Sequence, residues 1–229
     1  MGESLLRSAQ GIENEAMLLR KVEAGELRFG IGPMLAPFLT HTLAEFYTTG
    51  RHVNLEVVIE PIGRMLELLL TDRIEFFLSV IPESTPNPEI ELRKLSMIQV
   101  GYFVRKDHPL INAGLNVKGA TAAYLLATPR LNVAEQWADK NPPQSLPSAG
   151  HVQCDNIEVM KELAISSDAI LLALAPALEP ELSQGKYRKL PIEELEYNEL
   201  SVGIAKLASR SLSPAETHMP AMQAKLFGQ

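Results

Sequence analysis

The 229-residue sequence has little of several features that define large protein classes. Cys154 is the only cysteine, which excludes an internal disulfide and a cluster of thiolate metal ligands. No apolar run approaches the roughly 18 residues that a membrane-spanning helix needs. No basic stretch is present to neutralise phosphates, and the formal net charge is −7. We therefore expect no membrane partner and no direct contact of these residues with DNA.

The sequence also lacks a complete nucleotide-binding loop motif. The stretch GELRFGIGPMLAPFL leads from a strand-like segment through Gly32 and Pro33 into a helix-like one. A dinucleotide-binding loop needs a third glycine for close helix–strand packing, but Leu35 stands at that position. No Gly-Lys-Ser or Gly-Lys-Thr triplet occurs. We interpret the stretch as a strand-to-helix turn with Pro33 at the first helical position, and we expect no cofactor.

Catalytic and metal-ligating patterns are missing as well. None of the five histidines forms an i, i+4 pair or an HExxH motif, so we expect structural or surface roles for them and no metal site. No GxSxG motif occurs, and nothing assembles a nucleophile, a base and an oxyanion hole. The sequence predicts no catalytic residues and no enzyme.

What the sequence does have is an alternation of strand-like and helix-like segments. Strand patterns cover residues 26–32, 53–61, 74–82, 90–95, 97–106, 124–128, 151–155, 169–174 and 200–207. Helix patterns cover residues 35–46, 62–70, 133–140, 156–165, 175–185 and 214–226. This alternation predicts an α/β fold with mostly parallel sheets, and the break in rhythm near Arg105 indicates two lobes.

Residues 1–24 follow a different pattern. Apolar side chains recur in steps of four and three at Leu5, Ala9, Ile12, Ala16 and Leu19. This heptad seam predicts a helix that pairs with another chain; packing on its own domain is the alternative. The chain starts as though within this helix, so we expect it to be a piece of a longer protein.

Several stretches carry a family resemblance through their order. They are ESLLRSAQGIENEAMLLRKVEAGELRFGIGP, LAEFYTTGRHVNLEVVI, MLELLLTDRIEFFLSV, VRKDHPL, SSDAILLALAPALEPELSQGKYRKLPI and SRSLSPAETHMPAM. Together they resemble the linker helix and effector-binding (regulatory) domain of LysR-type transcriptional regulators over essentially the whole chain. Arg73 and Glu75 replace the family's usual Gly and Asp, and the family's N-terminal winged helix-turn-helix is missing from this chain.

The resemblance implies a two-lobed, periplasmic-binding-protein-like (type 2) fold, each lobe a mostly parallel sheet flanked by helices. We expect a linker and dimerisation helix at residues 1–24, lobe I at 25–104 and 205–229, and lobe II at 105–204. The implied function is sensing: a small molecule binds between the lobes of a cytoplasmic homodimer or homotetramer. DNA would be contacted only through the missing N-terminal domain.

A stand-alone solute-binding protein of a transport system is the alternative. That function needs a signal peptide or a lipidated cysteine near the start. Charged residues interrupt the first twenty positions and no cysteine lies there, so the regulator is the favoured interpretation.

Turns at the carboxyl ends of the expected strands supply the candidate effector-binding residues, because ligands of open α/β sheets bind there. The candidates are Gly32, Pro33, Met34, Ile62, Arg64, Ile81, Pro82, Thr128, Pro129, Arg130, Asn156 and Ile157. Capping and turn roles are the alternative for each of them singly.

The chemistry of these turns favours a carboxylate or another small anion. Helix N-termini, expected at Met34, Ile62 and Asn156, offer free N–H groups to an anion. Thr128 and Asn156 can add hydrogen bonds, and Arg130 or Arg64 a charge-assisted one. The family resemblance further implies that Met34 replaces a Ser or Thr that binds the effector in many relatives, which indicates a partly apolar ligand.

Overall fold

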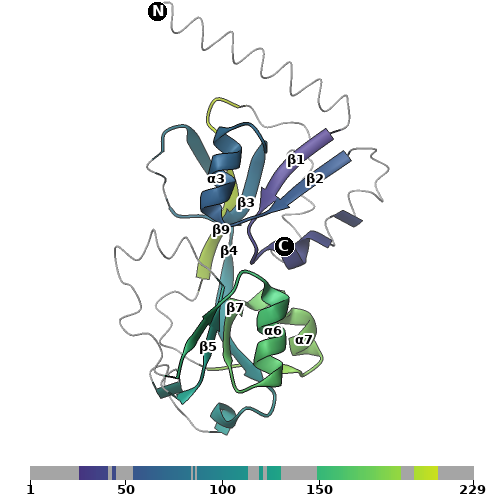
Figure 1. Ribbon diagram of the computed structural model, residues 1–229, viewed down its shortest axis with the longest axis vertical. Coiled ribbons are helices and arrows are strands. Elements are labelled where there is room, and N and C mark those ends of the chain that lie inside the picture. Colours follow the sequence, from purple (N-terminus) through teal and green to yellow (C-terminus); the bar gives the residue numbers. More distant parts are fainter. Residues whose placement is uncertain are drawn as a thin grey trace, which may run out of the picture. The chain divides into compact units, whose positions relative to one another are not determined.

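The computed structural model describes residues 26–40, 43–44, 54–83, 85, 87–112, 119–120, 123–129, 149–191 and 199–210. The chain divides into two compact units (Figure 1). Unit 1 takes the chain up to Ser96 and from Val202 onward, and unit 2 takes Met97–Ser201. Strands β4 (Ile90–Arg105) and β9 (Glu199–Leu207) each contribute residues to both units. The lobe boundaries expected at residues 104–105 and 204–205 stay a prediction.

Unit 1 is built on a sheet with a parallel centre. Strand β1 (Glu26–Ile31) pairs in parallel with β2 (Asn54–Ile59) on one side and β3 (Phe76–Val80) on the other. Strand β9 adds to β3 in the antiparallel direction. The strand order is therefore β2-β1-β3-β9, and β1, β2 and β3 all end at the same edge of the sheet.

Helix α3 (Ile62–Leu70) covers one face of this sheet (Figure 1). Its apolar residues recur every three or four positions, which brings Met65 and Leu69 to full burial against Phe77. Gly30 lies beneath the helix, where a Cβ would come within 2.9 Å of both Met65 Sδ and Phe77 Cβ. A glycine here lets the helix approach the sheet closely.

The end of α3 is a Schellman motif. The Asp72 N–H donates to Leu69 O (3.2 Å) and the Arg73 N–H donates to Leu68 O (2.8 Å), which is the bonding pattern of that motif. Asp72 has a positive φ of 57°, the conformation that glycine adopts at lowest cost. Its carboxylate also pairs with Arg210.

Two substitutions separate the backbone and charge contributions of Asp72. Both Asp72→Ala and Asp72→Gly remove the carboxylate, but only glycine relieves the left-handed conformation. We expect the glycine variant to be more stable than the alanine variant by about 1 kcal/mol in urea unfolding. Equal stability of the two variants would contradict the strain at this position.

Unit 2 repeats the plan of a parallel group with antiparallel additions. Strand β5 (Leu126–Thr128) lies in parallel between β6 (His151–Gln153) and β7 (Ile170–Leu174). Strands β7 and β8 (Tyr187–Lys189) pair with β4 in the antiparallel direction. This architecture confirms the expected α/β class.

Helix α6 (Ile157–Ser166) packs on the unit 2 sheet, with α7 (Glu179–Ser183) beside it (Figure 1). The core here joins Met160 to Phe103, Leu171 and Leu178. The single helix expected over 175–185 is divided into the 3₁₀ helix η3 (Ala175–Leu178) and α7. A proline in the first turn of α7 lacks the N–H that a continuous helix requires.

Gly185 follows the end of α7 with a positive φ of 67°, the left-handed conformation that glycine commonly adopts just past a helix. The two strands expected at 90–95 and 97–106 are one strand, β4, and β8 was not expected. A second short 3₁₀ helix, η2 (Pro109–Asn112), follows β4. Helices expected at 1–24, 133–140 and 214–226 lie outside the described residues. Among the helices that the structure describes, none has the length and apolar character needed to cross a membrane.

Candidate effector-binding site

The parallel strands of unit 1 bring three expected turns to one edge of the sheet. These turns follow Ile31, Ile59 and Val80, the last residues of β1, β2 and β3. Beyond β1, the Gly32 N–H donates to Leu78 O at 2.7 Å and so extends the pairing by one residue. We call this side of the sheet the unit 1 edge. It holds the candidate residues Gly32, Pro33, Met34, Ile62, Arg64, Ile81 and Pro82.

The turn after β1 differs from the expectation. The Leu35 N–H donates to Gly32 O (2.8 Å), and the 3₁₀ helix η1 (Ala36–Phe38) begins only after Leu35. Pro33 therefore lies in the turn, and the expectation that it opens the helix is wrong. Proline's fixed φ suits a turn as well as a first helical position, so the residue alone could not distinguish the two.

Two of the apolar candidate side chains at the unit 1 edge are mostly covered. Met34 is only 9% exposed and Ile81 only 3%. The helix N-terminus expected at Met34 is likewise absent, because Leu35 is the N-cap of η1. The unit 1 edge thus presents apolar side chains together with main-chain groups.

The N-terminus of α3 begins at Ile62, as expected, and has no side-chain cap. Pro61 is the N-cap residue, and no acidic residue occupies the first turn. Gly63 is exposed, and a Cβ there would have no neighbour within 4 Å. The first N–H groups of a helix need an external acceptor, so this end favours an anion.

The contacts of Arg64 indicate a role within helix α3 rather than in ligand binding. Its Nη1 donates to Glu67 Oε2 at 2.6 Å on the same helix, and both side chains are more than half exposed. Such an exposed i, i+3 pair contributes little to stability, about 0.5 kcal/mol or less. Its contact with an effector stays a prediction.

In unit 2, the parallel pairing of β5 and β6 places Thr128 near the start of α6. The Cys154 N–H donates to Thr128 O at 3.0 Å, just beyond the paired strands. Thr128 is buried, and its Oγ1 lies 2.7 Å from Nε2 of the exposed His151. No binding role was predicted for His151 from the sequence, because its hydrogen-bond partner, Thr128, lies on a different strand. Pro129 follows Thr128 and is buried, whereas Arg130 lies outside the described residues.

Asn156 is a helix cap. Its Oδ1 accepts hydrogen bonds from the Glu158 N–H (3.0 Å) and the Val159 N–H (3.3 Å), so this oxygen satisfies the start of α6. Ile157 begins the helix and packs into the unit 2 core. For Asn156, the capping role that was the alternative in the sequence is the one that the structure shows.

The cap can be tested with an isosteric pair. We expect Asn156→Ala to lower the free energy of unfolding by about 1 kcal/mol, and Asn156→Asp to keep most of it because a carboxylate caps equally well. Chemical denaturation of the three proteins measures this. An unchanged alanine variant would show that the cap contributes nothing.

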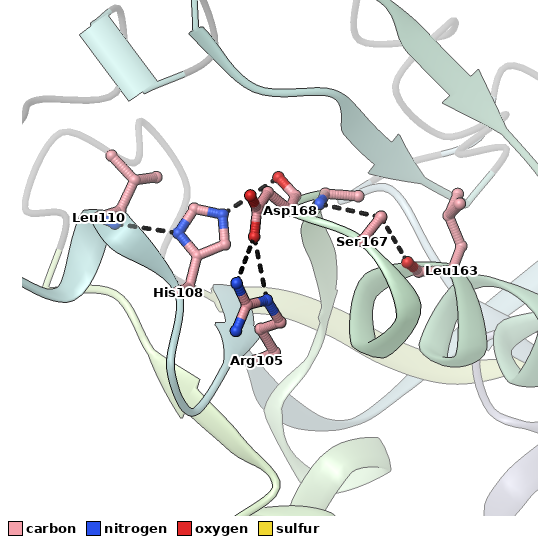
Figure 2. Close-up of polar contacts among 7 residues, drawn as sticks. Arg105, His108, Leu110, Leu163, Ser167 and Asp168 are labelled. Atoms are coloured by element: carbon pink, nitrogen blue, oxygen red, sulfur yellow. Dashed lines mark hydrogen bonds and ion pairs between the residues drawn. The ribbon is translucent and has the colours of Figure 1, made fainter.

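A second polar cluster in unit 2 surrounds His108, within the VRKDHPL stretch (Figure 2). The ring is 2% exposed; its Nδ1 accepts from the Leu110 N–H (3.0 Å) and its Nε2 lies 3.1 Å from Asp168 O. Because a backbone N–H only donates and a carbonyl only accepts, the ring carries its proton on Nε2. Arg105 donates from Nε and Nη2 to Asp168 Oδ1 at 3.0 and 2.7 Å.

This cluster ties the end of β4 to the turn between α6 and β7. In that turn, Ser167 Oγ donates to Leu163 O (2.6 Å) and accepts from the Ala169 N–H (3.2 Å). Every polar group named here has a partner within unit 2. We assign the cluster a structural role.

Three substitutions separate the contributions of the two hydrogen bonds of His108. His108→Asn can keep the acceptor for Leu110, His108→Gln can keep the donor to Asp168, and His108→Ala keeps neither. We expect the alanine variant to lose about 2–4 kcal/mol in urea unfolding, from the lost packing and the unpaired buried groups. The other two variants should lose less; an alanine variant as stable as either of them would contradict the two-bond bridge.

A buried ion pair fixes α6 to α7. Lys161 is 6% exposed, and its Nζ lies 3.1 Å from Glu158 Oε1 and 3.0 Å from Glu181 Oε1. The Tyr187 hydroxyl donates to Lys161 O at 2.5 Å, and burial, followed by the charge of Glu181, raises the pKa of Tyr187. The buried charge is thus paired, as such a charge must be. In the part of the chain that the structure describes, no three His, Cys, Asp or Glu side chains are grouped to hold a metal ion.

Comparison with known proteins identifies the family. Residues 20–221 match the model of the LysR substrate binding domain. A curated relative, the SDS degradation transcriptional activation protein of Pseudomonas sp. (strain ATCC 19151), is 26% identical over 220 residues, covering 94% of this chain and 71% of that protein.

Solved structures show the same fold. Full-length OxyR from Pseudomonas aeruginosa, in a variant with one cysteine replaced by aspartate, matches with a TM-score of 0.70 at 15% identity, over 99% of this chain and 76% of that one. The CcmR regulatory domain of Synechocystis PCC6803 in complex with 2-PG matches with a TM-score of 0.68 at 14% identity, over 88% of this chain and 97% of that one. These neighbours confirm the expected periplasmic-binding-protein-like fold.

The two units, each a parallel strand group with helices against it, thus define an effector-binding domain of the two-lobed type. The chain belongs to the LysR substrate-binding-domain family, whose members are transcriptional regulators rather than enzymes. Regulatory domains of this family bind small-molecule effectors and are typically oligomeric.

Proposed function

We propose that this regulatory domain senses a small organic anion that carries an apolar part. The observation that supports this most directly is the parallel register of β1 with β2 and β3. That register puts the uncapped N-terminus of α3 on the same edge as the turn after β1. The edge therefore combines free N–H groups, which suit an anionic head, with the apolar side chain of Ile59, which is 52% exposed at the end of β2 and suits a hydrocarbon.

The curated relative supports the same ligand class. Its name refers to the degradation of SDS, a sulfate ester on an alkyl chain. An alkyl sulfate and a fatty carboxylate both join an anionic head to an apolar tail. The effector of this chain belongs, in our proposal, to that class.

Binding would act by a population shift. An effector that prefers one arrangement of the regulatory domains biases the oligomer toward it, and only a difference in affinity between two states has an effect. In the full-length protein, which we place in the cytoplasm, that bias would reach DNA through the N-terminal domain. The remaining candidates in unit 2 (Thr128, Pro129, Arg130, Asn156 and Ile157) stay predictions, as does a ligand held by two lobes.

Thermal unfolding in the presence of matched ligands tests the proposal. We expect octanoate and hexyl sulfate to raise the melting temperature, because a ligand at 100 times its Kd stabilises by about 2.7 kcal/mol. Hexanol and hexylammonium share the apolar tail without the negative charge and should not do so. Equal stabilisation by the alcohol or the cation would contradict an anion-selective site.

Substitutions of Gly63 test whether the anion binds at the α3 N-terminus. Gly63→Glu places a carboxylate in the uncapped first turn, which favours the helix but competes with an anionic ligand. We expect this variant to fold at least as stably as the wild type and to lose most of the response to octanoate. Gly63→Ala is the matched control, since its Cβ meets nothing within 4 Å, and should keep the response.

A further inference from the structure

Ser79 is a hydroxyl in an otherwise apolar strand at the unit 1 edge. Strand β3 reads FFLSV and every residue in it is buried; Ser79 itself is 5% exposed. Its cross-strand partner on β9 is Gly203. Among the residues that the structure describes, none forms a hydrogen bond with Ser79 Oγ. The oxygen itself is not among the fully enclosed unpaired atoms, so it can donate to an acceptor from outside the fold.

Gly32 keeps this hydroxyl uncovered. A Cβ at position 32 would lie 2.6 Å from Ser79 Oγ, which is too close, but 3.4 Å from Ser79 Cβ and 3.5 Å from its Cα, which are ordinary contacts. The backbone of the two strands would therefore tolerate a side chain at position 32. A larger residue at position 32 would instead displace the Ser79 hydroxyl.

A second donor lies two residues further along the turn. The Gly32 N–H is used by Leu78 O, Pro33 has no N–H, and the Leu35 N–H is used by Gly32 O. The N–H of Met34, a buried residue, has no acceptor in the described part of the chain. Two unpaired donors, one from a side chain and one from the backbone, thus lie at the end of the β1 and β3 pair.

We propose that the Ser79 hydroxyl and the Met34 N–H donate hydrogen bonds to the oxygen-bearing head of the effector, a carboxylate or a sulfate. This assignment rests on the proposed function, since it takes the unit 1 edge as an organic-anion site. It adds a residue, Ser79, that no candidate in the sequence included.

Stability without ligand is the first test. Ser79 Oγ makes no hydrogen bond with the described residues, so Ser79→Ala should leave the melting temperature within about 2 °C of the wild type. Ser167→Ala is the matched control: its hydroxyl makes two hydrogen bonds, so the same change should lower the melting temperature. A melting temperature of Ser79→Ala below that range would show that the hydroxyl has an internal role and would overturn the assignment.

Ligand binding is the second test, with octanoate and hexyl sulfate as probes in titration calorimetry. We expect Ser79→Ala to weaken binding about tenfold or more, the effect of losing one hydrogen bond to a charged group. Gly32→Ala should weaken it similarly, because its Cβ displaces the hydroxyl, whereas Ser167→Ala should bind like the wild type.

The outcomes separate the two proposals. A wild type that binds neither probe would overturn the proposed function and, with it, the anionic class of ligand. A wild type that binds, together with a Ser79→Ala variant of equal affinity, would overturn the Ser79 assignment alone and leave the proposed function standing.

Discussion

The position of β1 between two parallel neighbours is the constraint on which unit 1 depends. Its register with β2 and β3 fixes where each strand ends and therefore which turns share an edge. The hydrogen bond from Gly32 to Leu78 O carries that register one residue past the strand, directly beside Ser79. Without this alignment, the α3 N-terminus and the turn after β1 would not lie on the same side of the sheet.

The polar groups of the structure fall into two kinds. In unit 2, both ring nitrogens of His108 and Oδ1 of Asn156 are paired within the fold, and their role is to hold turns and a helix start in place. At the unit 1 edge, Ser79 Oγ and the first N–H groups of α3 have no such partner among the described residues. The unpaired donors at the unit 1 edge give it the capacity to bind an acceptor from outside the fold.

Local patterns predicted much of the fold but less of the site. Helix α3 was expected over the residues where it occurs, because its apolar spacing is complete from Ile62 to Leu70. The roles of Pro33 and Asn156 were ambiguous, since proline suits turns and helix starts alike and asparagine both caps and binds. Ser79 was missed because a lone hydroxyl in an apolar strand becomes informative only when its neighbours on β1 and β9 are known. The family resemblance supplied the sensing function, which no single residue indicates.

The central claim, that the unit 1 edge receives the anionic head of the effector, is tested most directly by following backbone amide signals by NMR while octanoate is added. The account predicts that the largest shift changes occur at Met34, at Ile62 and Gly63 in the first turn of α3, and at Ser79. Signals from the capped start of α6, at Glu158 and Val159, serve as an internal reference and should move less. Changes centred on that reference, with the unit 1 edge unmoved, would contradict the claim.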